Sequence, residues 1–328
     1  MARNWVRDCN QNHEACCPRR TQEETPLPSR VVDVGDGLDQ PPRILESNGR
    51  SGAFAALSYC WGSHPSLRTT QMSLKSHLSQ LPLQNLSATV RQAIEVTRGL
   101  GLRYIWIDAL CIVQDDPDDW AREAAQMLQV YSNASVTISA STSSEASEGL
   151  FRSRDESNNF LLLSPVRLSL HVPRDLPVDK RGWILQEQEM STRLLHFGKG
   201  VLHWACLTSS GSEADPQGMS YDHAAFNKPR RERRYTIQRQ DRLGDAKYKL
   251  CEYWEELVAE YSKRKLSYAS DRIPAILGLA KMMAPALGSG EPIAGIWRGG
   301  EFSVRSLAWA AQTLGFANPC YPSWSWAS

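Results

Sequence analysis

Short apolar runs separated by amphipathic stretches fill the first half of the chain. Runs rich in Val, Ile and Phe between turn-forming residues predict strands, and apolar positions three or four apart predict helices. From residue 54 the elements alternate as strand, helix, strand, helix, strand. This order favours a parallel sheet covered by helices. The predicted strands are 30–34, 43–45, 54–59, 104–108 and 135–140, and the predicted helices are 87–99 and 117–131.

Residue chemistry marks the ends of both predicted helices. Ser87 is a suitable cap for the first helix, and Gly99 and Gly101 end it. The second helix begins with Pro117 and acidic residues, which the positive end of a helix dipole favours.

The second half of the chain is less regular. A Ser-rich loop (141–160) precedes one or two strands (161–172), a short helix (183–191), a hairpin (194–197 with 201–206) and helices at 245–265 and 271–287. We divide the chain into an N-terminal helix and arm (1–30), an α/β core (31–206), a basic polar loop (207–242) and a C-terminal helical region packed on the core (243–328).

Composition narrows the function classes. The 328 residues are 41% hydrophobic and 22% charged, with a formal net charge of +1. A nearly neutral chain gives no reason to expect nucleic acid as a partner, and the basic run at 228–242 has little aromatic interleaving. No run of eighteen apolar residues predicts a membrane span, and residues 1–8 lack a secretory core. We expect a cytoplasmic protein.

Polar residues follow two of the predicted strands. Asp108 ends one apolar run, Gln114 follows it, and Glu123 lies in the next helix. Because parallel sheets build sites at the carboxyl ends of their strands, we expect these three near one crevice. The competing interpretations are a turn cap for Asp108 and a dipole-complementing first-turn acid for Glu123.

The run 54–59 also ends in residues suited to ligand binding. Ser58 and Tyr59 close the predicted strand, and Trp61 and Gly62 follow. Gly62 would let backbone approach a ligand, and Tyr59 or Trp61 could stack on a nicotinamide or adenine ring. A structural turn with a core tryptophan is the alternative.

A second polar cluster lies near residue 185. Trp183 lies three and four positions from Gln186 and Glu187, so helical spacing puts them on one face. Arg181 is suited to a phosphate or to pairing with Glu187. Glu123 and Glu187 are candidates for a two-carboxylate site in which burial raises one pKa. A buried structural ion-pair network explains the same residues equally well.

The eight cysteines do not form a paired metal motif. Cys9, His13, Cys16 and Cys17 are metal-compatible residue types, but no second knuckle accompanies them. We therefore predict no metal and a docked helix with buried thiols. Neither Cys60 nor Cys111 has a local activating base, and no Gly-x-Ser-x-Gly elbow, Walker loop or Rossmann loop is present.

Together, several blocks of this sequence resemble the fungal heterokaryon-incompatibility (HET) domain family. The resemblance rests on these matching blocks, in order: 54–62, 93–94, 100–101, 104–114, 119–120, Glu123, Met127, 130–131, 149–151, 181–187, 204–206, 261–262, 271–279, 295–297 and 322–328. One departure is Ile184, where the family more often has threonine, so a hydroxyl is missing there.

The resemblance implies a TIR-like fold, which is a flavodoxin-like parallel sheet flanked by helices. A β-hairpin region and a C-terminal helical region elaborate it here. Many TIR domains cleave NAD at the nicotinamide–ribose bond, using one glutamate on the helix after the third strand. The stretch 119–123 is similar to that helix, so the resemblance implies Glu123 as the catalytic carboxylate.

Three functions stay open from the sequence. The first is TIR-like cleavage of NAD or a related nucleotide, with NAD as substrate and no cofactor. The second is a cofactor-free enzyme of fungal secondary metabolism that uses the same crevice. The third is a non-catalytic module for non-self recognition and cell death. We expect a small-molecule substrate for the enzymes, and a homo-oligomer is compatible with each function.

Overall fold

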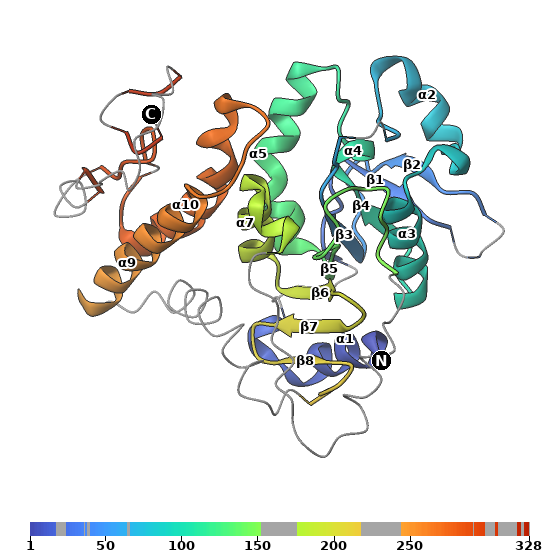
Figure 1. The fold of residues 1–328 in the computed structure, drawn as a ribbon, viewed down its shortest axis with the longest axis horizontal. Coiled ribbons are helices and arrows are strands. Elements are labelled where there is room, and N and C mark those ends of the chain that lie inside the picture. Colours follow the sequence, from blue (N-terminus) through green and yellow to red (C-terminus); the bar gives the residue numbers. More distant parts are fainter. Residues whose placement is uncertain are drawn as a thin grey trace. The chain divides into compact units, whose positions relative to one another are not determined.

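The computed structural model describes residues 1–17, 24–35, 37, 40–63, 66–151, 176–217, 244–290, 292–298, 306–307, 320–322 and 325–327. Eight strands within these ranges form one sheet with the order β2-β1-β4-β3-β5-β6-β7-β8 (Figure 1). The strands are β1 (Arg30–Asp33), β2 (Arg43–Glu46), β3 (Phe54–Ser58), β4 (Tyr104–Trp106), β5 (Val136–Ser139), β6 (Arg193–Phe197), β7 (Leu202–Cys206) and β8 (Ser210–Ser212).

The centre of the sheet is parallel, as the sequence predicts. β3 pairs in parallel with β4 and with β5, and β5 pairs in parallel with β6. Counted along the chain, these strands lie in the order second, first, third, fourth, which is the flavodoxin-type order. The sheet as a whole is mixed, because β1 and β2 join one side and β7 and β8 the other through antiparallel pairs.

Two helices flank the parallel strands. α3 (Ala88–Leu100) connects β3 to β4, and α5 (Pro117–Asn133) precedes β5. The chain reverses its direction across the sheet between these connections, so right-handed crossovers put the helices on opposite faces, as Figure 1 shows. The Tyr131 hydroxyl of α5 donates to Leu57 O of β3 at 3.1 Å, which ties that helix to the central strand.

The predicted helix ends are confirmed for both helices. The Ser87 side chain accepts a hydrogen bond from Val90 N at the start of α3, and Gly101 ends that helix with a left-handed φ of 80°. α5 has Pro117 in its first turn, and the Asp116 side chain accepts from the backbone of Asp118 and Asp119. These contacts satisfy amide groups that the first turn of a helix leaves without partners.

The predicted N-terminal helix and the predicted hairpin are also present. α1 (Ala2–Asn12) is followed by the short helix η1 (Glu14–Cys16), and β6 and β7 pair in antiparallel register. The predicted strand 104–108 is shorter than expected, because Asp108 begins the single-turn helix α4 (Asp108–Cys111). Elements that the sequence did not predict are α2 (Gln71–Ser79), η3 (Leu83–Asn85) and β8.

The chain divides into two compact units. The first comprises residues 1–178 and 190–228, and the second comprises residues 179–189 and 229–328. The second unit contains η4 (Pro177–Lys180) in part, nearly all of α7 (Gly182–Met190), α9 (Gly244–Tyr261), η5 (Ala269–Arg272) and α10 (Pro274–Leu287). The predicted strands at 161–172 and most of the predicted basic loop lie outside the described residues.

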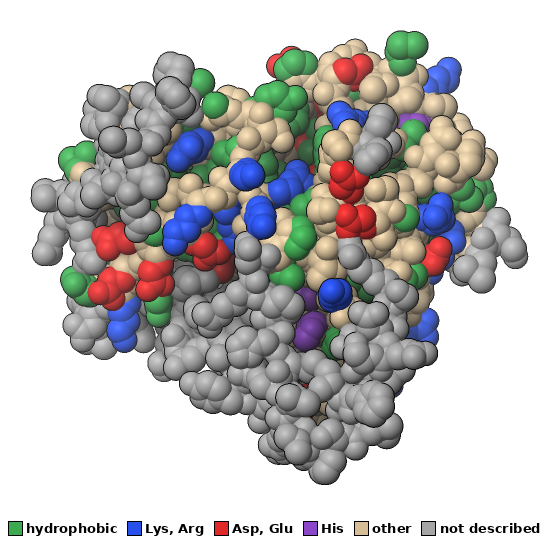
Figure 2. All heavy atoms as spheres, viewed as in Figure 1, with side chains coloured by type: hydrophobic (Ala, Val, Ile, Leu, Met, Phe, Trp, Pro, Cys, Tyr) green, Lys and Arg blue, Asp and Glu red, His purple; other side chains and the backbone are tan. Residues whose placement is uncertain are grey.

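Figure 2 shows side chains of both charge signs among the described residues of one face. None of the described helices combines the length and the apolar character that a membrane crossing requires.

Candidate functional site

The order of the parallel strands marks one place on the sheet as the candidate site. Strand order reverses between β3 and β5, because the chain moves from β3 to β4 on one side and then returns to β5 on the other. Open α/β sheets bind ligands outside the carboxyl ends of the strands at such a switch point. The residues that follow β3, β4 and β5 are therefore the candidates to inspect.

Three of the predicted residues meet at this edge. The Trp61 Nε1–H donates to Asp108 Oδ2 at 2.9 Å, and Gln114 Nε2 donates to the backbone oxygen of Asp108 at 3.0 Å. All three side chains are half-buried, so a ligand could reach them. One face of the Trp61 ring is covered by the guanidinium of Arg68, 5.0 Å from the ring centroid.

The loops that follow β3 and β5 touch at Gly62. This residue has a left-handed φ of 76°, and an added Cβ would lie 2.6 Å from Glu145 Cγ and 3.0 Å from Glu145 Cα. Ser63 Oγ donates to Glu145 Oε1 at 2.9 Å, and Ala146 N donates to Trp61 O at 3.3 Å. The missing side chain of Gly62 thus lets the two loops close together at the switch point.

A buried hydroxyl cluster lies beside the same strand ends, and the sequence predicted only Ser58 of it, with the neighbouring Tyr59. Ser139 Oγ is 3.1 Å from Ser141 Oγ, and Ser141 Oγ is 3.0 Å from His196 Nδ1. Ser58 pairs in register with Ser139, and its buried Oγ has no hydrogen-bond partner among the described residues. Tyr59 is buried next to it. The alternating serines in 135–143 were the available signal, but only the sheet register brings His196 to them.

The predicted catalytic residue Glu123 lies in a buried charge cluster. It is 3% exposed, and its Oε1 is 3.8 Å from the Arg30 guanidinium. Arg30 also donates to the Asp119 carboxylate and, at 2.7 Å, to Cys111 O. Asp119 accepts further hydrogen bonds from Val113 N and Arg122, both at 2.8 Å. Arg30 and Asp119 therefore join the loop after β4 to the first turn of α5.

The pKa values of the two acids in this cluster are shifted in opposite directions. Burial raises the pKa of Glu123, despite a hydrogen bond from Ser29 and the charge of Arg30. Burial acts in the same direction on Asp119, but hydrogen bonds from Arg30 and Val113 N outweigh it and lower the pKa of Asp119. Asp119 is thus the carboxylate that neutralises Arg30, and Glu123 is the one held closer to its neutral form.

Glu123→Gln is expected to gain stability relative to the wild type as pH rises. Below the pKa of an unfolded glutamate, near 4.3, both side chains are neutral and the difference is smallest. Above it, only the wild type must ionise a buried carboxyl group whose folded pKa is raised, so the wild type loses stability until pH exceeds that folded pKa. Urea unfolding of both proteins across this pH range measures the difference.

The matched control for this measurement is Glu95→Gln on the exposed surface of α3. Its stability relative to the wild type should stay constant within a few tenths of a kcal/mol over the same range. If the free energies of unfolding of Glu123→Gln and the wild type changed with pH in parallel, the raised pKa of Glu123 would be contradicted.

The remaining predicted residues lie in the second unit and have partners there. Trp183 Nε1 donates to Asp271 Oδ2 at 3.1 Å, and Gln186 Oε1 accepts from Gly278 N at 3.2 Å. Arg181 forms a bridge with the backbone of Lys265, and Glu187 is buried on α7. These contacts give Trp183 and Gln186 structural roles within their unit. The pairing of Glu123 with Glu187 stays a prediction, because the two acids lie in different units.

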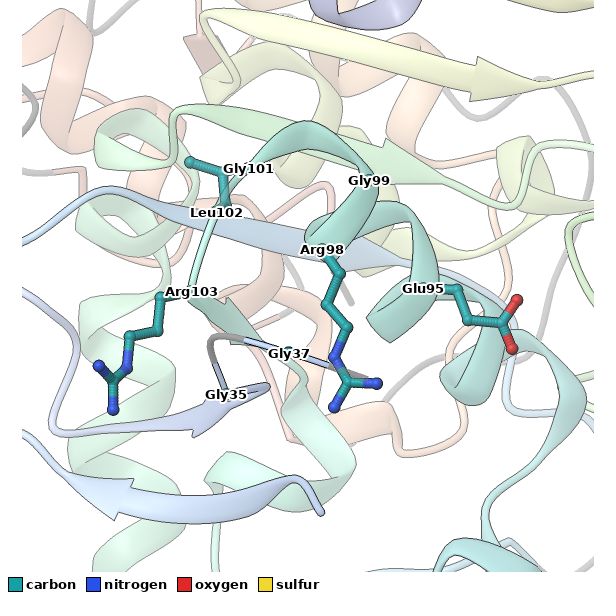
Figure 3. A pocket seen from close by; sticks show the side chains of 8 residues that line it. All are labelled: Gly35, Gly37, Glu95, Arg98, Gly99, Gly101, Leu102 and Arg103. Carbon is teal, nitrogen blue, oxygen red and sulfur yellow. The ribbon is translucent and has the colours of Figure 1, made fainter. Parts of the chain in front are cut away.

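A depression of about 480 Å³ lies at the opposite edge of the sheet. The loop after β1, the end of α3 and the start of β4 form it, and Figure 3 shows Arg98, Arg103 and Glu95 around it. Arg98 is engaged with Val34 O and Gln40 O, and Arg103 donates to Asp33 at 3.0 Å. Because the amino ends of parallel strands rarely carry the site, this depression is not our candidate.

One family model matches part of the chain. The family model for the heterokaryon incompatibility protein (HET) matches residues 54–187, from the first residue of β3 into α7. Residues 54–187 are a HET domain. No curated protein and no solved structure matches the chain.

All the site residues predicted from the sequence lie inside the HET match. The structure brings Trp61, Asp108 and Gln114 together and places Gly62 beside them. Arg30 lies outside the match, yet it organises the loop after β4. Its signal was a charged residue directly before two apolar strand residues. Ile184, which occupies the position of the more usual threonine, is fully buried.

Proposed function

We propose that this HET domain cleaves NAD or a related nucleotide at its N-glycosidic bond. The observation that carries the proposal is the flavodoxin-type strand order together with the half-buried Trp61, Asp108 and Gln114 at the carboxyl edge. The strand order agrees with the TIR-like fold that the family resemblance implies. The half-buried aromatic, acid and amide offer a stacking surface and polar groups suited to a nucleotide.

Three acids are candidates for the catalytic carboxylate. The family resemblance implies Glu123, which is buried on α5 beside Arg30. Asp108 is half-buried and hydrogen-bonded to Trp61 and Gln114 at the carboxyl edge. Glu187 belongs to the second unit, and its role stays a prediction. Asp108 is therefore the acid that we propose for the charge-stabilising role.

Cleavage of the nicotinamide–ribose bond requires a negative charge positioned near the ribose. The nicotinamide of NAD leaves as a neutral molecule from a cationic ring, so the bond breaks without a strong acid. A carboxylate near the ribose stabilises the oxocarbenium-like centre that develops. Water then adds to that carbon and loses a proton, so NAD and water give nicotinamide, ADP-ribose and a proton. Asp108 can hold the ribose hydroxyls in this scheme.

The test follows nicotinamide release from NAD by the purified chain. Wild-type protein is expected to release nicotinamide, and Asp108→Asn is expected to lower the rate about 100-fold, as the loss of a charge-stabilising group does. Glu123→Gln reports whether the buried acid of α5 takes that role instead. Glu95→Gln, an exposed change of the same kind, is the control and should retain the wild-type rate.

Any of three results would reject the proposal. The folded wild type releases no nicotinamide at any protein concentration. All four proteins release it at equal rates, or Glu95→Gln loses as much activity as the site variants. The hydrogen bonds that Trp61, Gln114 and Asp108 make to one another favour the non-catalytic recognition module as the alternative. An inactive wild type that self-associates through this edge would support that alternative.

A further inference from the structure

Four potential metal ligands converge where the N-terminal segment meets the β6–β7 hairpin. They are Cys9 of α1, His13, Cys16 of η1 and Cys206 at the end of β7. Their ligand atoms all lie within 4.8 Å of one another. The three cysteines are buried and His13 is half-buried. Among the described residues, this is the only such group of His, Cys, Asp and Glu side chains.

The residue set matches one well-defined kind of site. Three thiolates and one imidazole are a common ligand set for structural zinc, which takes four ligands in a tetrahedron. Ligands about 2.0–2.3 Å from a zinc ion lie roughly 3.5–3.8 Å from one another. His13 Nδ1 is already 3.4 Å from Cys206 Sγ. The remaining separations, within 4.8 Å, need only small side-chain rotations to reach that geometry.

The groups around the ligands are those that support bound thiolate and imidazole. The backbone N–H groups of Thr208 and Ser209 point at Cys206 Sγ, at 3.4 and 3.2 Å. Such N–H donors stabilise negative charge on sulfur. On the other side, His13 Nε2 is 3.8 Å from the Asp8 carboxylate. A carboxylate at the second ring nitrogen orients a metal-bound histidine and makes Nδ1 the ligand atom.

Arg193 supplies an independent observation. This guanidinium is 3% exposed, and its Nε is 3.1 Å from Cys9 Sγ. Its other partners are the backbone oxygens of Cys16 and Ser135, at 2.9 and 3.5 Å. No ion pair among the described residues includes Arg193. A buried positive charge needs a counter-charge. Zinc with three thiolates and a neutral imidazole carries a net charge of −1, which balances Arg193.

We propose that Cys9, His13, Cys16 and Cys206 bind one zinc ion. All four coordination positions are filled by protein, so the ion is structural and leaves no open position for substrate. It links the helix α1 and η1 to the last residue of β7, across more than 190 positions of sequence. The proposal concerns a part of the chain outside the HET match and does not depend on NAD cleavage.

Zinc content of the purified full chain is the first measurement. The protein is expressed without a polyhistidine tag, kept reduced and analysed by elemental mass spectrometry, with about one zinc per chain expected. Cys206→Ser should lower the zinc content at least tenfold. Cys17→Ser is the matched control, because Cys17 is exposed and adjacent to Cys16 but lies outside the cluster, and it should retain the zinc.

A second measurement on the wild type avoids any folding defect of the variants. Removing the ion with a chelator should lower the melting temperature by roughly 10 °C, and added zinc should restore it. Cobalt loaded in place of zinc should show the sulfur-to-metal absorption and the tetrahedral visible bands of a thiolate site.

Each of the following results would overturn the zinc proposal. The folded, reduced wild type contains no zinc and its melting temperature is unchanged by chelator and by added zinc. Cobalt gives no thiolate absorption. Mass spectrometry finds a disulfide between two of the three cysteines in protein prepared under reducing conditions. Cys17→Ser loses as much zinc as Cys206→Ser.

Discussion

Asp119→Asn is expected to lower the free energy of unfolding by about 3–5 kcal/mol, as the loss of one partner from a buried ion pair does. The carboxylate is 2% exposed and accepts hydrogen bonds from Arg30, Arg122 and Val113 N. An asparagine has one acceptor oxygen and no charge, so the Arg30 guanidinium would stay buried without its counter-charge. Urea unfolding at neutral pH measures the loss.

The effect should fade in acid. Interactions with Arg30 and Val113 N hold the pKa of Asp119 below its ordinary value despite burial. The ionised carboxylate therefore makes its full contribution to the free energy of unfolding above the unfolded pKa, which is near 3.9. It is lost as pH falls through the lower folded value, where the wild type also becomes neutral. Asp118→Asn is the control, because Asp118 is exposed in the same helical turn and should cost under about 0.5 kcal/mol. Equal losses in the two variants would show that the helix dipole, and not Arg30, accounts for the effect.

Gly62→Ala is expected to cost about 3 kcal/mol, from left-handed strain plus a collision. The residue has φ of 76°, and its new Cβ would lie 2.6–3.0 Å from the Cγ, Cβ and Cα atoms of Glu145. The Cα belongs to backbone, so the loop after β5 must shift. Thermal unfolding and nicotinamide release, measured together, report the stability and the site.

Gly49→Ala separates the two causes. Gly49 has φ of 77°, nearly the same backbone strain, but nothing lies within 4 Å of an added Cβ. It should therefore cost only about 1–2 kcal/mol. The difference between the variants is the collision with Glu145. If both variants lose the same stability, the close approach of the two loops does not constrain the switch point.

Much of the fold follows from local patterns. The helices α3 and α5 and the strands β3 and β5 are where periodicity and turn residues predict them, and Ser87 caps α3 as expected. Local sequence could not predict that the sheet is mixed. Antiparallel pairing of β1 with β4 joins residues about seventy positions apart, and no local period encodes that partner choice.

Only part of the candidate site could be predicted, because local sequence does not specify long-range contacts. Asp108 and Gln114 lie six residues apart after one strand, so their proximity follows from the chain itself. Arg30 and His196 reach the site only through sheet pairing, and Cys206 completes the metal cluster from the other end of the first unit. Contacts between distant segments depend on tertiary packing, which residue types and short-range spacing do not specify.

The segment 179–189 has a consequence for how this chain can be divided into fragments. It belongs to the second unit, although the chain on both sides of it belongs to the first. Within that unit Trp183 bonds to Asp271 and Gln186 to Gly278. The end of the family match at residue 187 is therefore not a folding boundary. A fragment that stops there would carry most of α7 without the rest of its unit, so a fragment that keeps this unit intact must also include residues 229–328.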